Sequence, residues 1–220
     1  MRFILILILL GSCAAPNSDL NKVFLKADDA TIEKFVERFE GESREISSAR
    51  DQIINALGLS EGMAVADIGA GTGLFEPLIH NAVGENGIVY AIDIAPKMVD
   101  YLKKRVNDEN LSTVEVIQCT ATQTFLAKES CDLVFICDTY HHFEYPAASL
   151  ADIKRSLKPG GRLAIVDFHR IEGESRDWIL SHVRCGQSTV IKEVLDAGFT
   201  LMESPKIDGL KENYLLIFQN

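Results

Sequence analysis

Residues Val65–Leu74 read VADIGAGTGL, an apolar run followed by a turn with glycines at positions 69, 71 and 73. The apolar run predicts a short buried strand, and the residues after the turn have the apolar spacing of a helix. Because glycine has no side chain, the main chain of such a turn can approach a ligand closely, and the start of the helix offers free N–H groups. We therefore predict a binding unit in which Gly69, Ala70, Gly71 and Gly73 contact the ligand.

The residues beside this turn favour one class of ligand. A dinucleotide-binding turn requires a glycine at position 74, where this chain has Leu74, and it tolerates no acid just before the turn. Asp67 lies two residues before Gly69, where its carboxylate would repel a pyrophosphate but suits an ammonium or sulfonium group. Asp93 ends the next apolar run and can accept hydrogen bonds from both hydroxyls of a ribose. The pattern therefore favours a positively charged nucleoside.

Outside this unit, apolar runs alternate with helical patterns along the chain. The expected strands are 63–68, 88–94, 114–118, 131–137, 162–168, 199–204 and 214–218, and the expected helices are 31–39, 44–57, 74–83, 96–106, 146–157 and 188–197. Such alternation predicts an α/β fold of the Rossmann-like, doubly wound type, with a mainly parallel seven-stranded sheet and helices on both faces. Ligands of these sheets bind beyond the carboxyl ends of the strands.

Three stretches, VADIGAGTG, VYAIDIAP and SLKPGGRLAIVDF, resemble the class I methyltransferases that use S-adenosylmethionine, and the likeness spans residues 60–168. The resemblance implies methyl transfer with S-adenosylmethionine as the cofactor. In that family the glycine turn packs against the methionine part, the acid matching Asp93 binds the ribose, and the next residue, here Ile94, packs on the adenine. An acidic adenine contact is common after the third strand, but this chain has CTAT at 119–122, so Thr120 or main-chain groups are expected to replace it.

Polar residues follow the fourth and fifth expected strands, in the sequences DTYHHF (138–143) and DFHR (167–170). The resemblance places acceptor-handling groups at this edge, and we expect Asp138 to contact the methionine or the acceptor. One interpretation is that His141, His142 or His169 removes a proton from the acceptor or orients it. The alternatives are a structural role or a metal site. Neighbouring residues of an extended segment point apart, so we predict no metal at His141 and His142.

Two further side chains near this edge have predicted roles. Asp167 and His169 are two residues apart on an extended strand and therefore share a face, so they are candidates for an orienting pair. Arg184 precedes the last helix, where it is expected either to contact an anionic group of the substrate or to form a surface salt bridge.

Length and charge limit the possible acceptors. A chain of 220 residues is expected to form one domain, and its net charge of −10 argues against nucleic-acid binding. Asp138 is not followed by the Pro-Pro-aromatic pattern of enzymes that methylate nucleic-acid amines. We therefore expect a small-molecule acceptor, or less favourably a protein, and the atom that is methylated stays open. The alternatives are a lipoprotein that binds an adenosyl or other nucleoside ligand without catalysis, and a nicotinamide-dependent oxidoreductase, which Asp67 and Leu74 disfavour.

The first residues have the pattern of an export signal. Arg2 precedes an apolar run at 3–10, and LGSC at 10–13 resembles the lipobox of bacterial lipoproteins. We expect a signal peptide at 1–12, a tether at 13–30 and a single domain at 31–220, with a lipidated Cys13 anchoring the protein to the membrane of the bacterial cell envelope. If the signal is not used, the protein stays cytoplasmic. The remaining cysteines, at positions 119, 131, 137 and 185, are expected to be reduced and buried.

Overall fold

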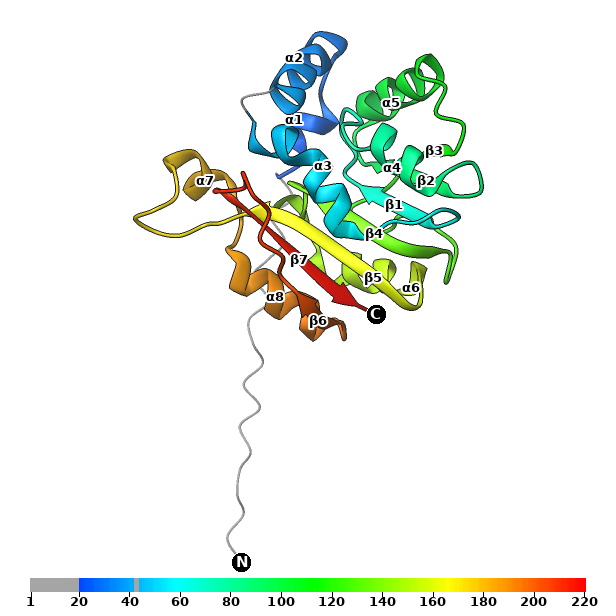
Figure 1. Cartoon of the computed structure of the whole chain (residues 1–220). Coiled ribbons are helices and arrows are strands. Elements are labelled where there is room, and N and C mark those ends of the chain that lie inside the picture. Colours follow the sequence, from blue (N-terminus) through cyan, green and yellow to red (C-terminus); the bar gives the residue numbers. More distant parts are fainter. Residues whose placement is uncertain (1–19, 42–43) are drawn as a thin grey trace, which may run out of the picture.

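The computed structural model describes residues 20–41 and 44–220 (Figure 1). The expected signal peptide and the first part of the expected tether lie outside these residues. No helix in the described part of the chain combines the length and the apolar character needed to cross a bilayer.

Seven strands form one sheet, as the sequence predicts. They are β1 (Ala64–Ile68), β2 (Ile88–Asp93), β3 (Val114–Gln118), β4 (Cys131–Cys137), β5 (Leu157–Phe168), β6 (Thr200–Glu203) and β7 (Asn213–Gln219), in the order β3-β2-β1-β4-β5-β7-β6. The strands β1 to β5 are parallel, and β7 is antiparallel to both β5 and β6. The predicted doubly wound, mainly parallel α/β fold is therefore confirmed.

Helices cover both faces of the sheet (Figure 1). One face carries α3 (Glu45–Leu57), α4 (Glu76–Val83) and α5 (Pro96–Asp108), and the other carries α6 (Pro146–Ser156) and α8 (Gln187–Asp196). The remaining helical elements are α1 (Lys22–Leu25), α2 (Asp29–Glu40), the 3₁₀ turn η1 (Tyr140–His142) and α7 (Asp177–His182). Proline at the first position of α5 and α6 fits helix starts, where its missing N–H costs no hydrogen bond.

Alternate residues of the central strands build two apolar cores. Val65 and Phe135 pack on one face with Ile79 of α4, whereas Ala66 and Ile136 pack on the other face. Since side chains alternate across a strand, a strand covered on both sides must be apolar at nearly every position. This requirement explains the uninterrupted apolar runs by which the strands were predicted.

The strand order creates a crevice at the carboxyl edge of the sheet. From β1 the chain runs outward through β2 and β3, and it then returns to place β4 on the other side of β1. The connections that leave β1 and β4 therefore diverge, which opens a space between them at the switch point.

The N-terminal residues from position 20 differ from the predicted tether. They form α1 and the start of α2, and the ring of Phe24 lies 5.3 Å from that of Phe35. The buried Asn21 donates hydrogen bonds through Nδ2 to the carbonyl oxygen of His142 (3.2 Å) and to Oε1 of Glu144 (3.1 Å). A helix of four residues shows no periodicity in a sequence, and tertiary contacts of this kind are what hold it in place.

Candidate active site

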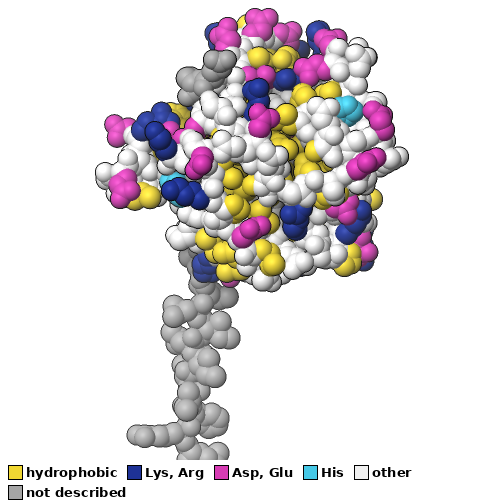
Figure 2. Space-filling view, in the orientation of Figure 1, with side chains coloured by type: hydrophobic (Ala, Val, Ile, Leu, Met, Phe, Trp, Pro, Cys, Tyr) yellow, Lys and Arg dark blue, Asp and Glu magenta, His cyan; other side chains and the backbone are white. Residues whose placement is uncertain are grey.

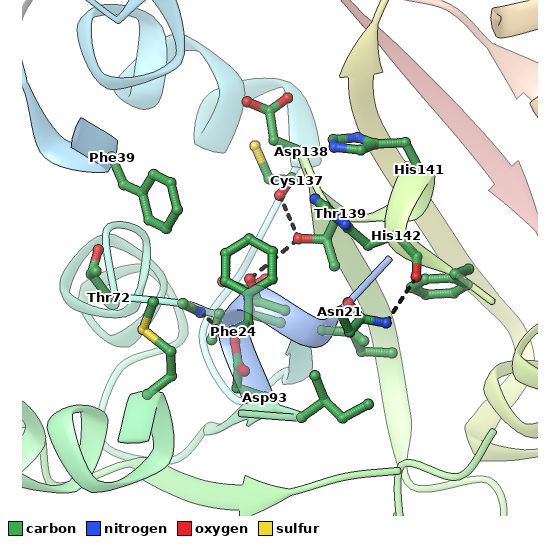
Figure 3. A pocket seen from close by; sticks show the side chains of 18 of the residues that line it. Asn21, Phe24, Phe39, Thr72, Asp93, Cys137, Asp138, Thr139, His141 and His142 are labelled. Carbon is green, nitrogen blue, oxygen red and sulfur yellow. Dashed lines mark hydrogen bonds between the residues drawn. The ribbon is translucent and has the colours of Figure 1, made fainter. Parts of the chain in front are cut away.

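A cavity of about 690 Å³ lies beyond the carboxyl ends of β1, β2 and β4 (Figure 3). Its volume is within the range of about 300–1,000 Å³ that is typical of small-molecule sites. Asp67, Asp93 and Asp138 line it where the strands end, and the N-terminal helices and α7 provide other walls. The cavity therefore lies where the sequence analysis expects the ligand.

The three glycines of the β1–α4 turn have different tasks, although all have positive φ angles (80°, 58° and 88°). A Cβ atom on Gly69 would lie 2.2 Å from Cγ2 of Thr139, so this glycine allows the turns after β1 and β4 to touch. At Gly71 the nearest atom to such a Cβ is 3.8 Å away, and this residue lines the cavity together with Ala70. Gly73 instead packs against α5 and is not among the residues that line the cavity, so its predicted contact with the ligand stays a prediction.

Asp67 places a buried acid at the cavity. Burial, together with the carboxylates of Glu76 and Asp93, raises the pKa of Asp67 well above its ordinary value. Burial also raises the pKa of Glu76 to about 7, and neither carboxyl oxygen of Glu76 has a hydrogen-bond partner among the described residues. Opposite charge favours ionised carboxylates, so a cationic ligand at this position would stabilise the acidic pair.

Asp93 is held in a defined position at the end of β2. Its carboxylate accepts hydrogen bonds from the backbone N–H groups of Gly71 (2.9 Å) and Ala95 (2.8 Å), and it thereby ties the glycine turn to the neighbouring strand. Ile94 and Thr120 line the cavity beside it, as predicted. The Thr120 hydroxyl accepts a hydrogen bond from the N–H of Gln123 (3.1 Å), so it also shapes the turn after β3.

Asp138 lines the cavity, but it already has protein partners. Arg44 forms an ion pair with its carboxylate, and Nδ2 of Asn213 donates a hydrogen bond to the other oxygen (2.5 Å). Burial raises the pKa of Asp138, although Arg44 acts in the opposite direction. The sequence analysis missed both partners, since they lie 94 and 75 positions away and no local pattern connects them to Asp138.

Asp167 orients a histidine, but not the one predicted. Its carboxylate lies 2.7 Å from Nδ1 of His141 and also accepts a hydrogen bond from the backbone N–H of His141 (2.9 Å). Burial disfavours the protonated imidazole, but Asp167 outweighs it and raises the pKa of His141. His169 follows the end of β5 and lies against Tyr214 at 5.3 Å, where it lines a separate small cavity. His169 is therefore outside the main cavity, and its predicted pairing with Asp167 is wrong.

His141 and His142 lie on the same side of the chain because η1 is a 3₁₀ turn and not an extended segment (Figure 3). The centroids of their rings are 4.3 Å apart, and the ring of His182 on α7 lies 5.2 Å from His141 and 5.0 Å from His142. The geometric reason for predicting no metal here is thus wrong. The sequence analysis did not predict α7, a helix of six residues, and so did not bring His182 into the site.

Aromatic side chains form a further wall of the cavity. They come from α1 and α2, from the residue after η1, from the end of β5 and from α7, and they are Phe24, Phe35, Phe39, Phe143, Phe168 and Trp178. Trp178 stacks on the ring of His182 at 4.7 Å. Arg184 does not line the cavity, because it forms an ion pair with Glu193 (2.7 Å), which was one of its two predicted roles.

Comparison with known proteins identifies the domain. The family model described as "Methyltransferase domain" matches residues 66–165. The structure of an S-adenosylmethionine-dependent methyltransferase from Aquifex aeolicus is 29% identical, with a TM-score of 0.77 over 88% of this chain and 99% of that chain. Residues 66–165 match a methyltransferase domain, and the chain has the fold of an S-adenosylmethionine-dependent methyltransferase.

Other relatives of this methyltransferase domain match over shorter stretches or in fold alone. The ubiquinone/menaquinone biosynthesis C-methyltransferase of Shewanella pealeana is 28% identical over 122 residues, which is 55% of this chain and 49% of that protein. The chain spans about half the length of the curated relatives it matches. The geranyl diphosphate C-methyltransferase of Streptomyces coelicolor is 14% identical, with a TM-score of 0.67 over 90% of this chain and 84% of that chain, and shows a likeness of fold.

The residues of the methyltransferase cavity fit S-adenosylmethionine. Gly71 leaves open space beside the main chain, Asp93 is fixed where a ribose can reach it, and the buried Asp67 is close to other carboxylates and suits a cationic group. Together they form a cradle for a nucleoside with a positive charge.

Proposed function

We propose that the protein transfers a methyl group from S-adenosylmethionine to a small molecule with an apolar or aromatic body. The observation that carries this proposal is the continuity of one cavity, in which the cofactor cradle around Gly71 and Asp93 shares its space with the aromatic wall. A sulfonium supplies a methyl group that is already activated, so the main task of the chain is to hold the acceptor in line. Phe39 and Phe143 would enclose the acceptor, and His141 and His142 would orient its reacting group.

The names of the curated relatives support a particular set of trial acceptors. Several are C-methyltransferases of quinone biosynthesis, whose printed names imply ring-containing products. The aromatic wall would suit a phenol or a reduced quinone by ring packing. A panel of phenols, quinols, thiols and amines therefore covers the chemistry that the cavity favours.

Two measurements distinguish methyl transfer from the two alternative functions, nucleoside binding without catalysis and nicotinamide-dependent oxidoreduction. We expect S-adenosylhomocysteine to bind in a calorimeter and at least one acceptor to gain a methyl group by mass spectrometry. We also expect Asp93→Ala to weaken nucleoside binding about tenfold or more, equivalent to about 1.4 kcal/mol. The exposed Asp196→Ala is the matched control. Binding without transfer to any acceptor would support a non-catalytic nucleoside-binding protein, and binding of NAD alone would support an oxidoreductase.

The described surface gives no support for a nucleic-acid acceptor. On the face in Figure 2, acidic and basic side chains are interspersed, with apolar side chains between them. The net charge of −10 adds a repulsion from phosphates. A small acceptor that enters the cavity is consistent with both observations.

We also propose that Cys13 is lipidated and anchors the enzyme in the bacterial cell envelope. The support is the apolar run at 3–10 followed by LGSC at 10–13. Mass spectrometry of the protein purified from its own cells should find an acylated Cys13 as the first residue. An intact Met1 would contradict the proposal and would favour the cytoplasmic alternative.

A further inference from the structure

Three imidazoles gather at one side of the methyltransferase cavity and form what we call the histidine cluster: His141, His142 and His182. One ring nitrogen of each lies within 4.8 Å of a ring nitrogen of the other two. All three residues line the cavity, His141 and His142 from η1 and His182 from α7. Two elements separated by about forty residues thus bring three metal-ligating side chains to one point.

The first ligand is oriented by a carboxylate. Asp167 is hydrogen-bonded to Nδ1 of His141, and both side chains are almost fully buried. Nε2 is therefore the nitrogen of His141 that is left for a ligand. Metal-binding histidines commonly have their other nitrogen hydrogen-bonded to a carboxylate in this way, because the contact fixes the ring and strengthens its basicity.

The second ligand has an unused nitrogen. Nδ1 of His142 is buried and has no hydrogen-bond partner in the described part of the chain. Buried polar atoms without partners are rare in folded proteins, and contact with a bound ion is one explanation for them. The backbone of Leu20 also hydrogen-bonds to this ring, which leaves Nδ1 as the ring nitrogen without a partner.

The third ligand is held in place by an aromatic contact. Trp178 stacks on His182, and the ring of Phe168 packs edge-on against both Trp178 and His141. An apolar shell of this kind limits the access of solvent to a metal and controls its chemistry.

We propose that the histidine cluster binds a divalent transition metal, with Zn²⁺ as the matching ion. Three imidazole nitrogen donors and an open fourth position facing a cavity are the arrangement of catalytic zinc sites. Zn–N bonds of about 2.05 Å place the nitrogen atoms of tetrahedral ligands about 3.4 Å apart. A modest rotation of the half-buried His142 and His182 rings would bring the three nitrogens from within 4.8 Å of one another to this spacing. Asp167, which is hydrogen-bonded to His141, places a negative charge directly behind the cluster.

The site has a consequence that rests on the proposed methyl transfer. The open position faces the space beside the aromatic wall, where the acceptor would lie. A hydroxyl or thiol of the acceptor that binds the metal there would lose its proton more readily, because a bound cation stabilises the anion. The proton of the acceptor would pass to solvent. The deprotonated oxygen or sulfur would form a bond to the methyl carbon while the bond from that carbon to the sulfonium sulfur breaks, and S-adenosylhomocysteine would leave. The metal would thus hold the acceptor atom and keep it nucleophilic.

Metal binding can be tested without knowledge of the acceptor. The full chain is purified with an affinity tag that contains no histidine, treated with a chelator, and titrated with Zn²⁺ against a coloured competing chelator. We expect one equivalent to bind, and we expect Co²⁺ to give the visible absorption bands of a four-coordinate site. Asp167→Asn should weaken binding by about 10–100-fold, as loss of a carboxylate behind a ligand does.

The ligand variants make the test specific. His142→Ala and His182→Ala should each weaken Zn²⁺ binding more than Asp167→Asn does, whereas His80→Gln, on α4 outside the cavity, should leave it unchanged. Circular dichroism and binding of S-adenosylhomocysteine check that each variant is folded. The proposal is overturned if the folded wild-type protein binds less than one equivalent of Zn²⁺ at micromolar concentrations, or if His182→Ala binds it as tightly as the wild type. Failure to bind S-adenosylhomocysteine would count instead against the proposed methyl transfer.

Discussion

At the scale of single residues, the chemistry of the site depends on partners that are distant in sequence. The two-residue spacing of a strand makes Asp167 and His169 candidates for an orienting pair, but Asp167 contacts His141 instead. Likewise, the glycine turn is predicted as a ligand-binding loop, and three of the four residues predicted to contact the ligand line the cavity, but Gly69 also packs against Thr139, and Gly73 packs against α5. Spacing identifies which residues matter but does not identify their partners.

Gly69→Ala should be much more destabilising than Gly209→Ala. Both positions have positive φ, which costs a side-chain-bearing residue of order 1–3 kcal/mol. At Gly209 nothing lies within 4 Å of an added Cβ, whereas at Gly69 the Thr139 side chain would clash with it. We expect an extra loss of about 1–3 kcal/mol for Gly69→Ala in urea unfolding. Adding Thr139→Ala should recover part of this loss, and equal stabilities for the two single variants would contradict the packing role.

The pKa of His142 predicts how stability changes with pH. Burial, then His141 and His182, lowers this pKa to about 3, against 6.5 for the exposed side chain. The unfolded state therefore binds the proton more readily, so stability is fully present above pH 6.5 and is lost as the pH falls towards 3. In chelator-treated protein, the free energy of unfolding should fall more between pH 6.5 and 5 for the wild type than for His142→Gln. Parallel pH profiles for the two proteins would contradict the lowered pKa.

At the scale of elements, long periodic segments were predicted well and short ones were missed. The strands β3 and β4 have the predicted bounds, whereas α1, η1 and α7 were not predicted as helical. Elements of three to six residues have too few positions for a period to appear, and tertiary contacts stabilise them. The missed elements bring Phe24, His142 and His182 to the cavity, so the acceptor side was predicted less well than the cofactor side.

Phe24→Ala should loosen α1 without affecting the sheet. The ring of Phe24 packs edge-on against His142 at 5.2 Å and contacts Phe35, and a helix of four residues has little stability of its own. We expect amide hydrogens of α1 to exchange faster by mass spectrometry, while those of β1 and β4 keep their protection. Val23→Ala, at a side chain that is 57% exposed, is the matched control. Unchanged exchange in α1 of Phe24→Ala would show that other contacts hold it.

At the scale of the whole molecule, the cavity is lined by both halves of the sheet. Asp93 belongs to the half that runs from β1 to β3, and Asp138 to the half that begins with β4, with the cavity between them. A ligand that contacts both halves is bound by the native state and not by the unfolded chain, so it must stabilise the fold.

Heat denaturation should therefore depend on the concentration of S-adenosylhomocysteine. At 100 times its Kd, a ligand adds about 2.7 kcal/mol of stability. For a chain of this size that corresponds to a rise in Tm of about 5–10 °C. Differential scanning fluorimetry should show this rise with S-adenosylhomocysteine and none with NAD at the same concentration. A rise with NAD alone would contradict the assignment of the cradle.

The sequence by itself determined the sheet, the edge at which the cavity lies and most of the residues that line it beside β1 and β2, because each is encoded by neighbouring residues. A buried strand must be apolar along its length, and a tight turn at a ligand must be rich in glycine. Only the tertiary structure brought Asp167 to His141, Arg44 to Asp138 and His182 to the 3₁₀ turn. These contacts join segments tens of residues apart, and their geometry depends on how short irregular elements pack, which no local pattern records.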